Sequence, residues 1–183
     1  MVKVYILLAD GFEEVEALTP ADVLRRAGFE VFLVSTTGAP VITGSHDISV
    51  KTDVFLNDVD SGTGTILILP GGLPGTTNLF GNEKVKSLIQ KFYDNGKWLA
   101  AICAAPMILG EMKLLEGKKS TCYPGFEKHL HGAELTNEQA VTDGKIVTGR
   151  GIGAAMAFSL EIVKNLSTDE SLASELAKKM VVS

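Results

Sequence analysis

The feature that most constrains this chain is a repeated alternation of short apolar runs with segments of helical periodicity, which starts at its second residue. Continuous runs rich in Val, Ile and Leu are typical of strands buried on both faces. Strands and helices that alternate in this way form βαβ units, which place a mostly parallel sheet between two layers of helices. The sequence therefore predicts an α/β fold. The four main predicted strands are residues 2–9, 30–35, 65–69 and 98–102.

Amphipathic periodicity predicts the helices that connect these strands and continue beyond them. The expected helices span residues 13–27, 84–93, 105–112, 154–165 and 169–179. Short strands are expected at 119–122 and 146–148, and a small hairpin is expected from residues 41–42 and 48–50. Pro20 interrupts the pattern, because a proline inside a helix removes a hydrogen bond, and it predicts a kink or a delayed start in the first helix.

Length and composition exclude several classes of protein. At 183 residues the chain is expected to form one domain, 1–183. The net charge of −5 and the lack of a basic run argue against nucleic-acid binding. The sequence contains no run of 18 apolar residues, so no membrane span is expected. The N-terminus lacks a signal-peptide pattern. Two cysteines do not make a disulfide framework, so the reducing cytoplasm is the expected location.

Three strand exits carry the residues that can do chemistry. In a parallel sheet the carboxyl ends of the strands meet at one edge, and ligands bind there. This rule brings together residues 10–16, residues 70–72 and Cys103. We therefore expect any reactive centre of this chain at that edge.

Cys103 lies where the apolar run ends and helix-compatible residues begin, and Pro106 suits the first turn of that helix. A cysteine at a helix start is close to free N–H groups and to the positive end of the helix dipole, which favours the thiolate. The expected pKa of Cys103 is therefore depressed. The alternative stays open that Cys103 is a small buried residue that acts only as part of the core.

Two further groups are expected to face Cys103. Glu13 and Glu14 suit a helix N-terminus as acidic residues, but Glu16 can point towards the strand ends instead. A buried carboxyl beside a forming thiolate has a raised pKa, so Glu16 can stay protonated and donate a hydrogen bond to the sulfur. The N–H groups of Gly72 and Ala104 are candidates for an oxyanion hole, although residues 70–72 also suit a simple turn.

The remaining polar motifs are weaker. Residues 149–153 form a glycine-rich turn with only a loose likeness to a phosphate loop, and Arg150 is expected to pair with a carboxylate. His46, His129 and His131 show no metal-ligand spacing with either cysteine, so we expect no metal site. No cofactor is required by any motif.

Taken in order, Glu13-Glu-x-Glu16, Leu69-Pro-Gly-Gly72 and Ala100-Ala-Ile-Cys-Ala-Ala-Pro106 resemble the ThiJ/PfpI family. That family includes the human Parkinson-disease-linked deglycase and belongs to the class I glutamine-amidotransferase-like superfamily. Residues 25–28 and 148–153 extend the resemblance over nearly the whole chain. It implies a flavodoxin-like three-layer sandwich and a homodimer.

The resemblance also assigns roles to individual residues. It implies Cys103 as the reactive cysteine, Glu16 as the protonated glutamate bonded to its sulfur, and Gly72 and Ala104 as backbone donors. Arg26 matches a position near the dimer interface and the pocket of family members. His46 stands where the human relative has a second interface arginine.

The sequence departs from the family at two positions near the cysteine. Relatives with a well-formed site have a histidine before a proline, where this chain has Tyr123-Pro124. Tyrosine is a poor general base at neutral pH. The peptidase-like branch has a histidine directly after the cysteine, where this chain has Ala104, which argues against proteolysis. His129 and His131, in the loop that follows, are the alternative candidates for the general base in place of the missing histidine.

Two functions follow as expectations. The first is a glyoxalase or deglycase that acts on reactive aldehydes such as methylglyoxal, or on glycated side chains, through Cys103 with Glu16 as proton shuttle. The second is a non-catalytic sensor of oxidative stress, or a redox-regulated chaperone, in which Cys103 is oxidised. A regulatory disulfide between Cys103 and Cys122 is a further alternative that spacing alone does not decide.

Overall fold

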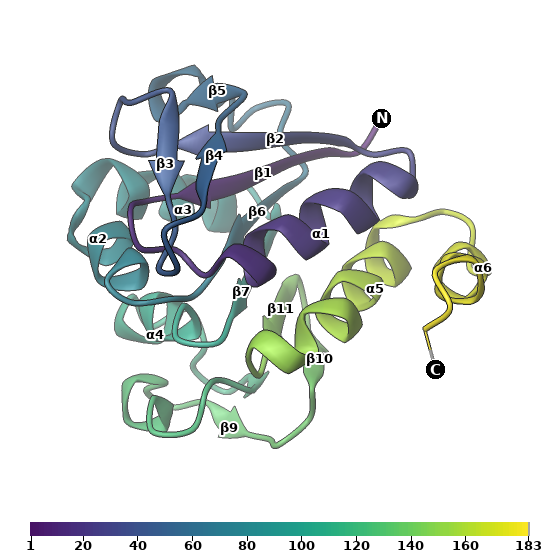
Figure 1. Ribbon diagram of the computed structural model, residues 1–183. Helices are drawn as coiled ribbons and strands as arrows, with labels where there is room; N and C mark the ends of the chain where they lie inside the picture. The colour runs from purple at the N-terminus through teal and green to yellow at the C-terminus, as the bar shows by residue number, and fades with distance from the viewer. Residues whose placement is uncertain (183) are drawn as a thin grey trace.

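A seven-stranded sheet forms the centre of the computed structural model, which describes residues 1–182 (Figure 1). The strand order is β10-β11-β7-β6-β1-β2-β5, and every neighbouring pair is parallel except β10 with β11. The strands are β1 Lys3–Leu8, β2 Glu30–Ser35, β5 Val54–Phe55, β6 Ile66–Leu69, β7 Trp98–Ile102, β10 Ala140–Asp143 and β11 Ile146–Gly149. The predicted, mostly parallel α/β sheet is confirmed.

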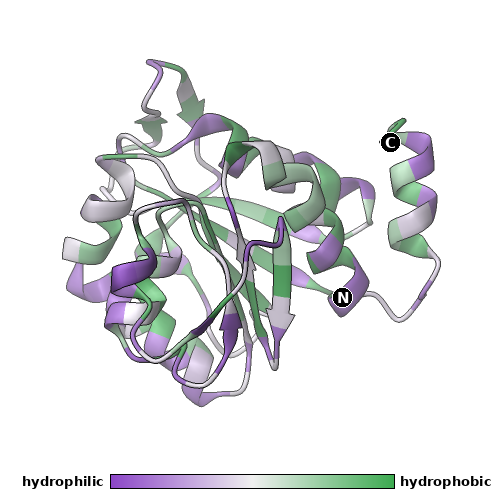
Figure 2. Cartoon of the chain, turned by 90° about the horizontal axis from the view of Figure 1, so that it is seen from below, coloured by the Kyte–Doolittle hydropathy of each residue, from purple (hydrophilic) through white to green (hydrophobic). Residues whose placement is uncertain are grey.

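Both faces of the sheet are covered by helices, which explains the continuous apolar runs. Along β1, Tyr5 and Leu7 pack into one hydrophobic cluster, whereas Val4 and Ile6 pack into a second cluster on the opposite face. Successive side chains of a strand point to opposite faces, so a strand between two helical layers needs apolar residues at every position. Figure 2 shows this arrangement as hydrophobic central strands with hydrophilic segments on the outer surface.

Each cluster contains the apolar face of a different set of helices (Figure 1). The first set is α2 Gly75–Gly81, α3 Glu83–Asp94 and α4 Pro106–Glu111. The second set is α1 Glu14–Arg26, α5 Ala155–Leu166 and α6 Leu172–Lys179. The expected three layers are therefore present. Sequence reasoning did not identify α2, because its residues GTTNLFG are mostly weak helix formers.

The prediction that Pro20 delays the start of the first helix is wrong. α1 runs from Glu14 to Arg26 with Pro20 inside it. The helix buries Ala17, Val23 and Leu24 in the core. This burial outweighs the single hydrogen bond that Pro20 cannot donate.

Two smaller sheets lie outside the main one. The predicted hairpin is confirmed as β3 Val41–Thr43 paired antiparallel with β4 Ser49–Lys51. Main-chain bonds hold its turn against the start of α1, because Ser45 N–H donates to Phe12 C=O at 2.8 Å. The second sheet pairs β8 Lys119–Ser120 with β9 Glu134–Leu135. Short 3₁₀ turns occur at Leu56–Asp58, Glu127–His129 and Ile152–Ala154.

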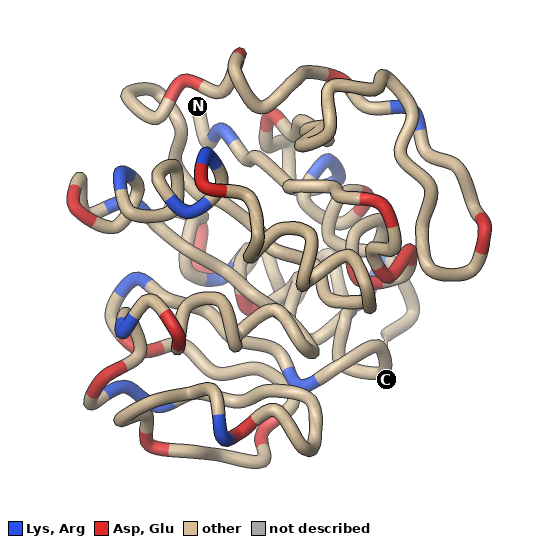
Figure 3. Tube along the Cα trace, turned by 90° about the vertical axis from the view of Figure 1, so that its left-hand side faces the viewer, with Lys and Arg blue, Asp and Glu red and all other residues tan. Residues whose placement is uncertain are grey.

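Charged residues occur throughout the chain, and its helices are short. Acidic and basic positions are interspersed along the chain trace in Figure 3. Among residues 1–182 there is no helix with both the length and the apolarity that crossing a bilayer requires.

Candidate active site

Cys103 occupies a strained turn between β7 and α4. Its φ of 65° lies in the left-handed region that residues other than glycine rarely adopt. Two main-chain bonds hold this conformation: Cys103 N–H donates to Gly149 C=O at 2.9 Å, and Tyr123 N–H donates to Cys103 C=O at 2.8 Å. Strain of this kind persists only where surrounding structure fixes it, and it is frequent at functional sites.

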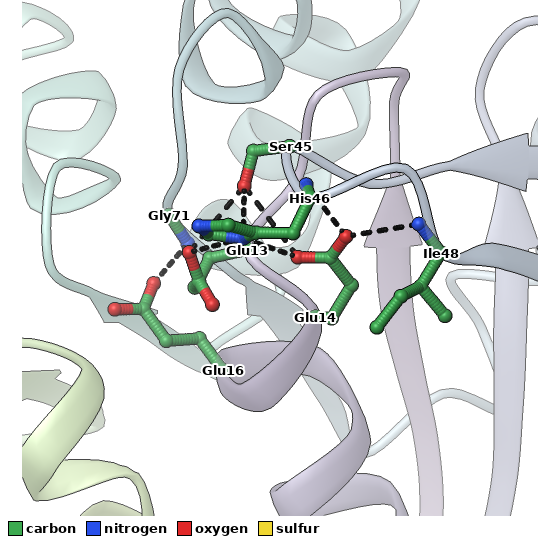
Figure 4. A network of polar contacts seen from close by, with 7 residues as sticks. All are labelled: Glu13, Glu14, Glu16, Ser45, His46, Ile48 and Gly71. Atoms are coloured by element: carbon green, nitrogen blue, oxygen red, sulfur yellow. Dashed lines mark hydrogen bonds and ion pairs between the residues drawn. The ribbon is translucent and has the colours of Figure 1, made fainter.

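Glu16 points from the first turn of α1 into the protein and has no exposed surface. Its Oε2 accepts the N–H of Gly71 at 3.0 Å, as Figure 4 shows. Its Oε1 is also buried and has no hydrogen-bond partner of good geometry within residues 1–182. A side-chain interaction with Cys103 shifts the pKa of both groups. The predicted proximity of Glu16 to Cys103 is therefore present.

The electrostatics of this pair differ from the sequence expectation. Burial raises the pKa of Glu16 to about 7, although the hydrogen bonds to Cys103 and Gly71 oppose this rise. Burial, the negative charge of Glu16 and its hydrogen bond raise the pKa of Cys103 to about 12. The expected depressed thiol pKa is thus contradicted. Sequence position indicates the helix start, but it does not show how far the sulfur is desolvated.

The main-chain N–H groups of Gly72 and Ala104 face the Cys103 sulfur and act in the opposite direction. Each of these hydrogen bonds lowers the pKa of Cys103, although together they do not offset burial and the Glu16 charge. Gly72 has a φ of 88°, a conformation that glycine adopts at no steric cost. Both predicted backbone donors therefore lie close enough to the Cys103 thiol to affect its pKa.

Gly71 separates the two side chains and leaves no room for a larger residue. A Cβ added at Gly71 would lie 2.5 Å from Glu16 Oε2 and 2.7 Å from Cys103 Cβ. The strand-to-loop turn thus has a glycine because the carboxyl and the thiol both pack directly on its Cα.

Gly71→Ala is therefore expected to destabilise the protein and to disrupt this pair. Overpacking a buried site costs about 2 kcal/mol, which corresponds to a fall in Tm of roughly 4–8 °C for a chain of this size. Thermal unfolding measures this change. Gly81→Ala is the matched control, because nothing lies within 4 Å of a Cβ added there. An unchanged Tm for Gly71→Ala would contradict the packing described above.

His46 lies beside Glu13 and Glu14, and its ring makes its polar contacts with these two residues and with Ser45. Its Nδ1 is 3.0 Å from Glu14 Oε2 and 3.5 Å from Glu13 Oε2. Burial raises the pKa of Glu14, but hydrogen bonds from the His46 ring and from main-chain N–H groups lower it to about 2. Sequence analysis missed this cluster, because His46 in the hairpin and Glu14 at the start of the helix are 32 residues apart in the chain.

The remaining residues predicted to lie near the pocket or the dimer interface are Arg26, Tyr123 and Arg150. Arg26 pairs with Asp22 at 2.6 Å in the last turn of α1, roughly 15 Å along the helix from Glu16. Arg150 Nη1 donates to Asn137 Oδ1 at 2.8 Å, so the expected carboxylate partner is wrong and an amide takes its place. Tyr123 and Arg150 line a hollow of about 320 Å³ beside the Cys103 turn.

Neither alternative histidine base is placed beside Cys103. His129 Nδ1 and His131 Nε2 contact Glu111 at 2.7 and 3.3 Å, at the far end of α4. Cys122 packs in the cluster opposite to the one that Cys103 contacts, and both cysteines are free. A Cys103–Cys122 disulfide is therefore not formed.

Together these features define a class: doubly wound α/β proteins with a strained cysteine on the turn after a central strand. The model of the DJ-1/PfpI family matches residues 2–165. The chain belongs to the DJ-1/PfpI family.

Relatives within this family differ in length. Protein DJ-1 homolog B of Arabidopsis thaliana is 40% identical over 166 residues, which are 90% of this chain and 38% of that protein. The chain thus spans little more than a third of the Arabidopsis protein. A protein of Pyrococcus horikoshii that is named a deglycase is 37% identical over 168 residues, which are 90% of this chain and 99% of that protein.

Two solved structures have nearly the same fold. An alanine mutant of a DJ-1 superfamily protein from Salmonella typhimurium has a TM-score of 0.94 at 30% identity and covers 99% of this chain and 98% of its own. Oxidized DJ-1 of Toxoplasma gondii has a TM-score of 0.93 at 30% identity, with the same coverage.

Proposed function

We propose that this protein is a cysteine-dependent enzyme of the glyoxalase or deglycase type, which acts in the cytoplasm on small reactive aldehydes such as methylglyoxal or on glycated side chains. The observation that carries the proposal is the buried Glu16 against the strained Cys103, because a pKa of about 7 suits a group that must take up and release a proton near neutral pH. The deglycase name of the Pyrococcus relative supports the same class of substrate.

In the first step the thiol of Cys103 adds to the aldehyde carbon. The Glu16 carboxylate takes the proton from sulfur, an S–C bond forms, and the carbonyl π electrons move to oxygen. Glu16 then returns the proton to that oxygen and gives a neutral hemithioacetal. This route needs no resting thiolate, so it agrees with the raised pKa of Cys103.

The later steps move a proton within the substrate. Glu16 removes the proton from the aldehyde-derived carbon and delivers it to the neighbouring ketone carbon, while the hydroxyl proton of the hemithioacetal passes to the former ketone oxygen. The two transfers convert the hemithioacetal to a lactoyl thioester without net oxidation. Water then cleaves the thioester to lactate and regenerates the thiol. The N–H groups of Gly72 and Ala104 are proposed to stabilise the developing oxyanion.

The test is lactate formation from methylglyoxal by the purified protein. The proposal predicts many lactate molecules per protein molecule and a transient adduct on the peptide that contains Cys103, which mass spectrometry detects. Fewer than one lactate per protein, with methylglyoxal consumed only by surface Lys and Arg, would refute it.

Tyr123 offers a test by gain of function. Tyr123→His introduces a base next to the Cys103 turn, where the hollow lined by Tyr123 and Arg150 is open to solvent. We expect kcat/KM for methylglyoxal to rise by about tenfold or more, because a positioned general base typically contributes far more than that. Tyr123→Phe is the control and should leave the rate unchanged. A histidine variant no faster than wild type would show that residue 123 does not limit turnover.

A second candidate function is a redox sensor. Cys103 is partly exposed, whereas Cys122 is 3% exposed, and the Toxoplasma relative was solved in an oxidized form. Peroxide would convert the Cys103 thiol to sulfenic acid with release of water, and the oxidised oxygens would accept the Gly72 and Ala104 N–H groups. Mass spectrometry after mild peroxide treatment measures the oxidation of each cysteine, and Cys103 should be oxidised in preference to Cys122. Equal oxidation of the two cysteines would exclude this function.

We also propose a homodimer. Apolar side chains are exposed on one face of α1, at Val15 and Leu18, and on the nearby hairpin, at Val41 and Ile48. A second copy that covers them would remove this apolar surface from water. Light scattering should give twice the 19.4 kDa chain mass, and a Leu18→Lys variant should shift the protein to monomers. A wild-type protein that is monomeric at micromolar concentration would exclude the dimer.

A further inference from the structure

The hollow beside the Cys103 turn contains no residue that the proposed reaction uses. Its volume is about 320 Å³, and it is lined by residues 123–124, Gln139 and residues 150–154. Pockets that bind small ligands have volumes from about 300 Å³ upward. Methylglyoxal is much smaller than the ligands that such pockets hold, so the hollow has room for a further part of the substrate.

Main-chain hydrogen bonds place this hollow next to the proposed nucleophile. Cys103 N–H donates to Gly149 C=O at 2.9 Å, and Arg150 directly follows Gly149. On the other side, Tyr123 N–H donates to Cys103 C=O at 2.8 Å. Chain segments joined by such bonds lie about 5 Å apart, so the lining residues begin one strand spacing from Cys103. A short substrate bonded to the sulfur can therefore reach the hollow.

Arg150 gives the hollow a positive charge that the protein does not balance. No Asp or Glu lines the hollow, and within residues 1–182 no carboxylate forms an ion pair with Arg150. The one side-chain hydrogen bond of Arg150 in this part of the chain runs from Nη1 to Asn137 Oδ1 at 2.8 Å. Guanidinium groups typically bind a carboxylate through two parallel hydrogen bonds. The carboxylate partner expected from the sequence is thus absent from the described protein, which leaves its place to the acidic group of a ligand.

The rest of the lining suits a short carbon chain attached to that acidic group. Pro124, Ile152 and Ala154 are apolar, and Ile152 is 48% exposed, so the hollow is reached from solvent. Arg150 is held at the rim, because its main-chain N–H donates to Gln139 C=O at 2.9 Å. The four apolar side chains of the proposed dimer face do not line the hollow. Ligand binding here therefore does not require that face to be uncovered.

We propose that this hollow binds a carboxylate of the substrate and that Arg150 determines the specificity for it. The preferred substrates are then α-oxoaldehydes that carry a carboxylate a few bonds from the carbonyl groups, rather than neutral ones such as methylglyoxal. A single guanidinium balances the charge of one carboxylate, whereas a phosphate ester carries about two negative charges. The reaction of these substrates rests on the proposed function, but the binding of the acid does not.

The covalent steps are those already proposed for Cys103. The aldehyde carbon is oxidised to a second carboxylate, the ketone carbon is reduced to an alcohol, and one water molecule is added. The redox change is internal to the substrate, so no other oxidant or reductant takes part. Arg150 contributes only by holding the existing carboxylate, which positions the aldehyde at the sulfur.

Two aldehydes with the same carbon chain length up to the acidic group test the proposal. 4,5-Dioxopentanoate carries the carboxylate, and 2-oxopentanal has a methyl group in its place. For the wild-type protein we expect kcat/KM to be at least about tenfold higher for the acid, the usual contribution of a hydrogen bond to a charged group. Arg150→Gln should abolish this preference. A mere loss of fold would lower both rates and leave their ratio unchanged.

Two further variants control for charge. Arg150→Lys keeps the positive charge without the planar fork, so it should retain part of the preference for the acid. Lys145→Gln removes a positive charge at the opposite end of β11, where Lys145 Nζ donates to Gly96 C=O at 2.6 Å, and it should leave the ratio as in the wild type. A wild-type protein without preference for the acid, or an unchanged ratio in Arg150→Gln, would overturn the proposal.

Binding without turnover separates this inference from the proposed enzyme activity. 4-Oxopentanoate has the same carboxylate but a methyl group in place of the aldehyde group. It should shift the amide NMR signals of Gln139, Gly151 and Ile152 in the wild type but not in Arg150→Gln. A protein that binds this acid and turns over no aldehyde would refute the proposed function and support the acid site.

The opposite result is equally informative. A protein that turns over methylglyoxal but shows none of these shifts would overturn the acid site and leave the proposed function intact. Tighter binding of inorganic phosphate than of 4-oxopentanoate at the same amide groups would overturn the assignment to a carboxylate.

Discussion

Replacing Cys103 with alanine is expected to lower kcat/KM for methylglyoxal by roughly 10³-fold or more. The sulfur forms the bond to the aldehyde carbon in the proposed mechanism, and it is the group on which the Gly72 and Ala104 N–H groups act. The measurement is the initial rate of lactate formation at saturating and at low methylglyoxal. Any residual lactate formation reports turnover that does not use the Cys103 sulfur.

Cys122→Ala is the control for this variant. Cys122 is 3% exposed and packs on the opposite face of the sheet, so its removal should leave kcat/KM within about twofold. Equal rates for wild type and Cys103→Ala would show that the cysteine has no part in turnover. A preserved circular dichroism spectrum in both variants ensures that a loss of rate is not a loss of fold.

Replacing Glu16 with glutamine is expected to lower kcat/KM by about 10²–10⁴-fold, the usual contribution of a positioned general base. For the wild type, the sign of the pH dependence follows from the raised pKa of about 7. The base acts as a carboxylate, so activity should rise as pH increases through about 7 and fall by about tenfold per pH unit below it. Glu16→Gln should lose both the activity and this acid limb.

Alkylation of Cys103 should change in the opposite direction in the same variant. The negative charge of Glu16 raises the pKa of Cys103, so its removal lowers that pKa and should accelerate reaction with iodoacetamide between about pH 8 and 10. Slower turnover together with faster alkylation is a combination that a merely structural role would not give. Glu83→Gln, an exposed carboxylate in the first turn of α3, should alter neither rate. Slower alkylation of Glu16→Gln would show that Glu16 promotes the thiolate instead.

The fold was predictable because its signals are local. The apolar run of β1 is buried on both faces, and the small residues Ala100 and Ala101 in β7 continue into the cysteine turn. Glu16 was predictable for a related reason: residues after strand ends meet at one edge of a parallel sheet. In contrast, α2 has few strong helix formers, and Pro20 is tolerated because α1 is packed on the core.

The errors concern quantities that depend on neighbours distant in sequence. The partner of Arg150 is an amide on the strand-to-strand connection, which no periodicity indicates. The pairing of His46 with Glu13 and Glu14 depends on how the hairpin folds back over the start of α1.

The sequence by itself determined the four main parallel strands, the helices other than α2, the position of Cys103 at a strand exit and the membership of a family. Each of these is encoded in residue types at fixed short spacings. Only the tertiary structure decided the protonation of the Cys103–Glu16 pair and the cluster of Glu13, Glu14 and His46. Both depend on desolvation and on charges brought within a few ångströms by packing, since an electrostatic interaction is set by distance and surroundings rather than by separation along the chain.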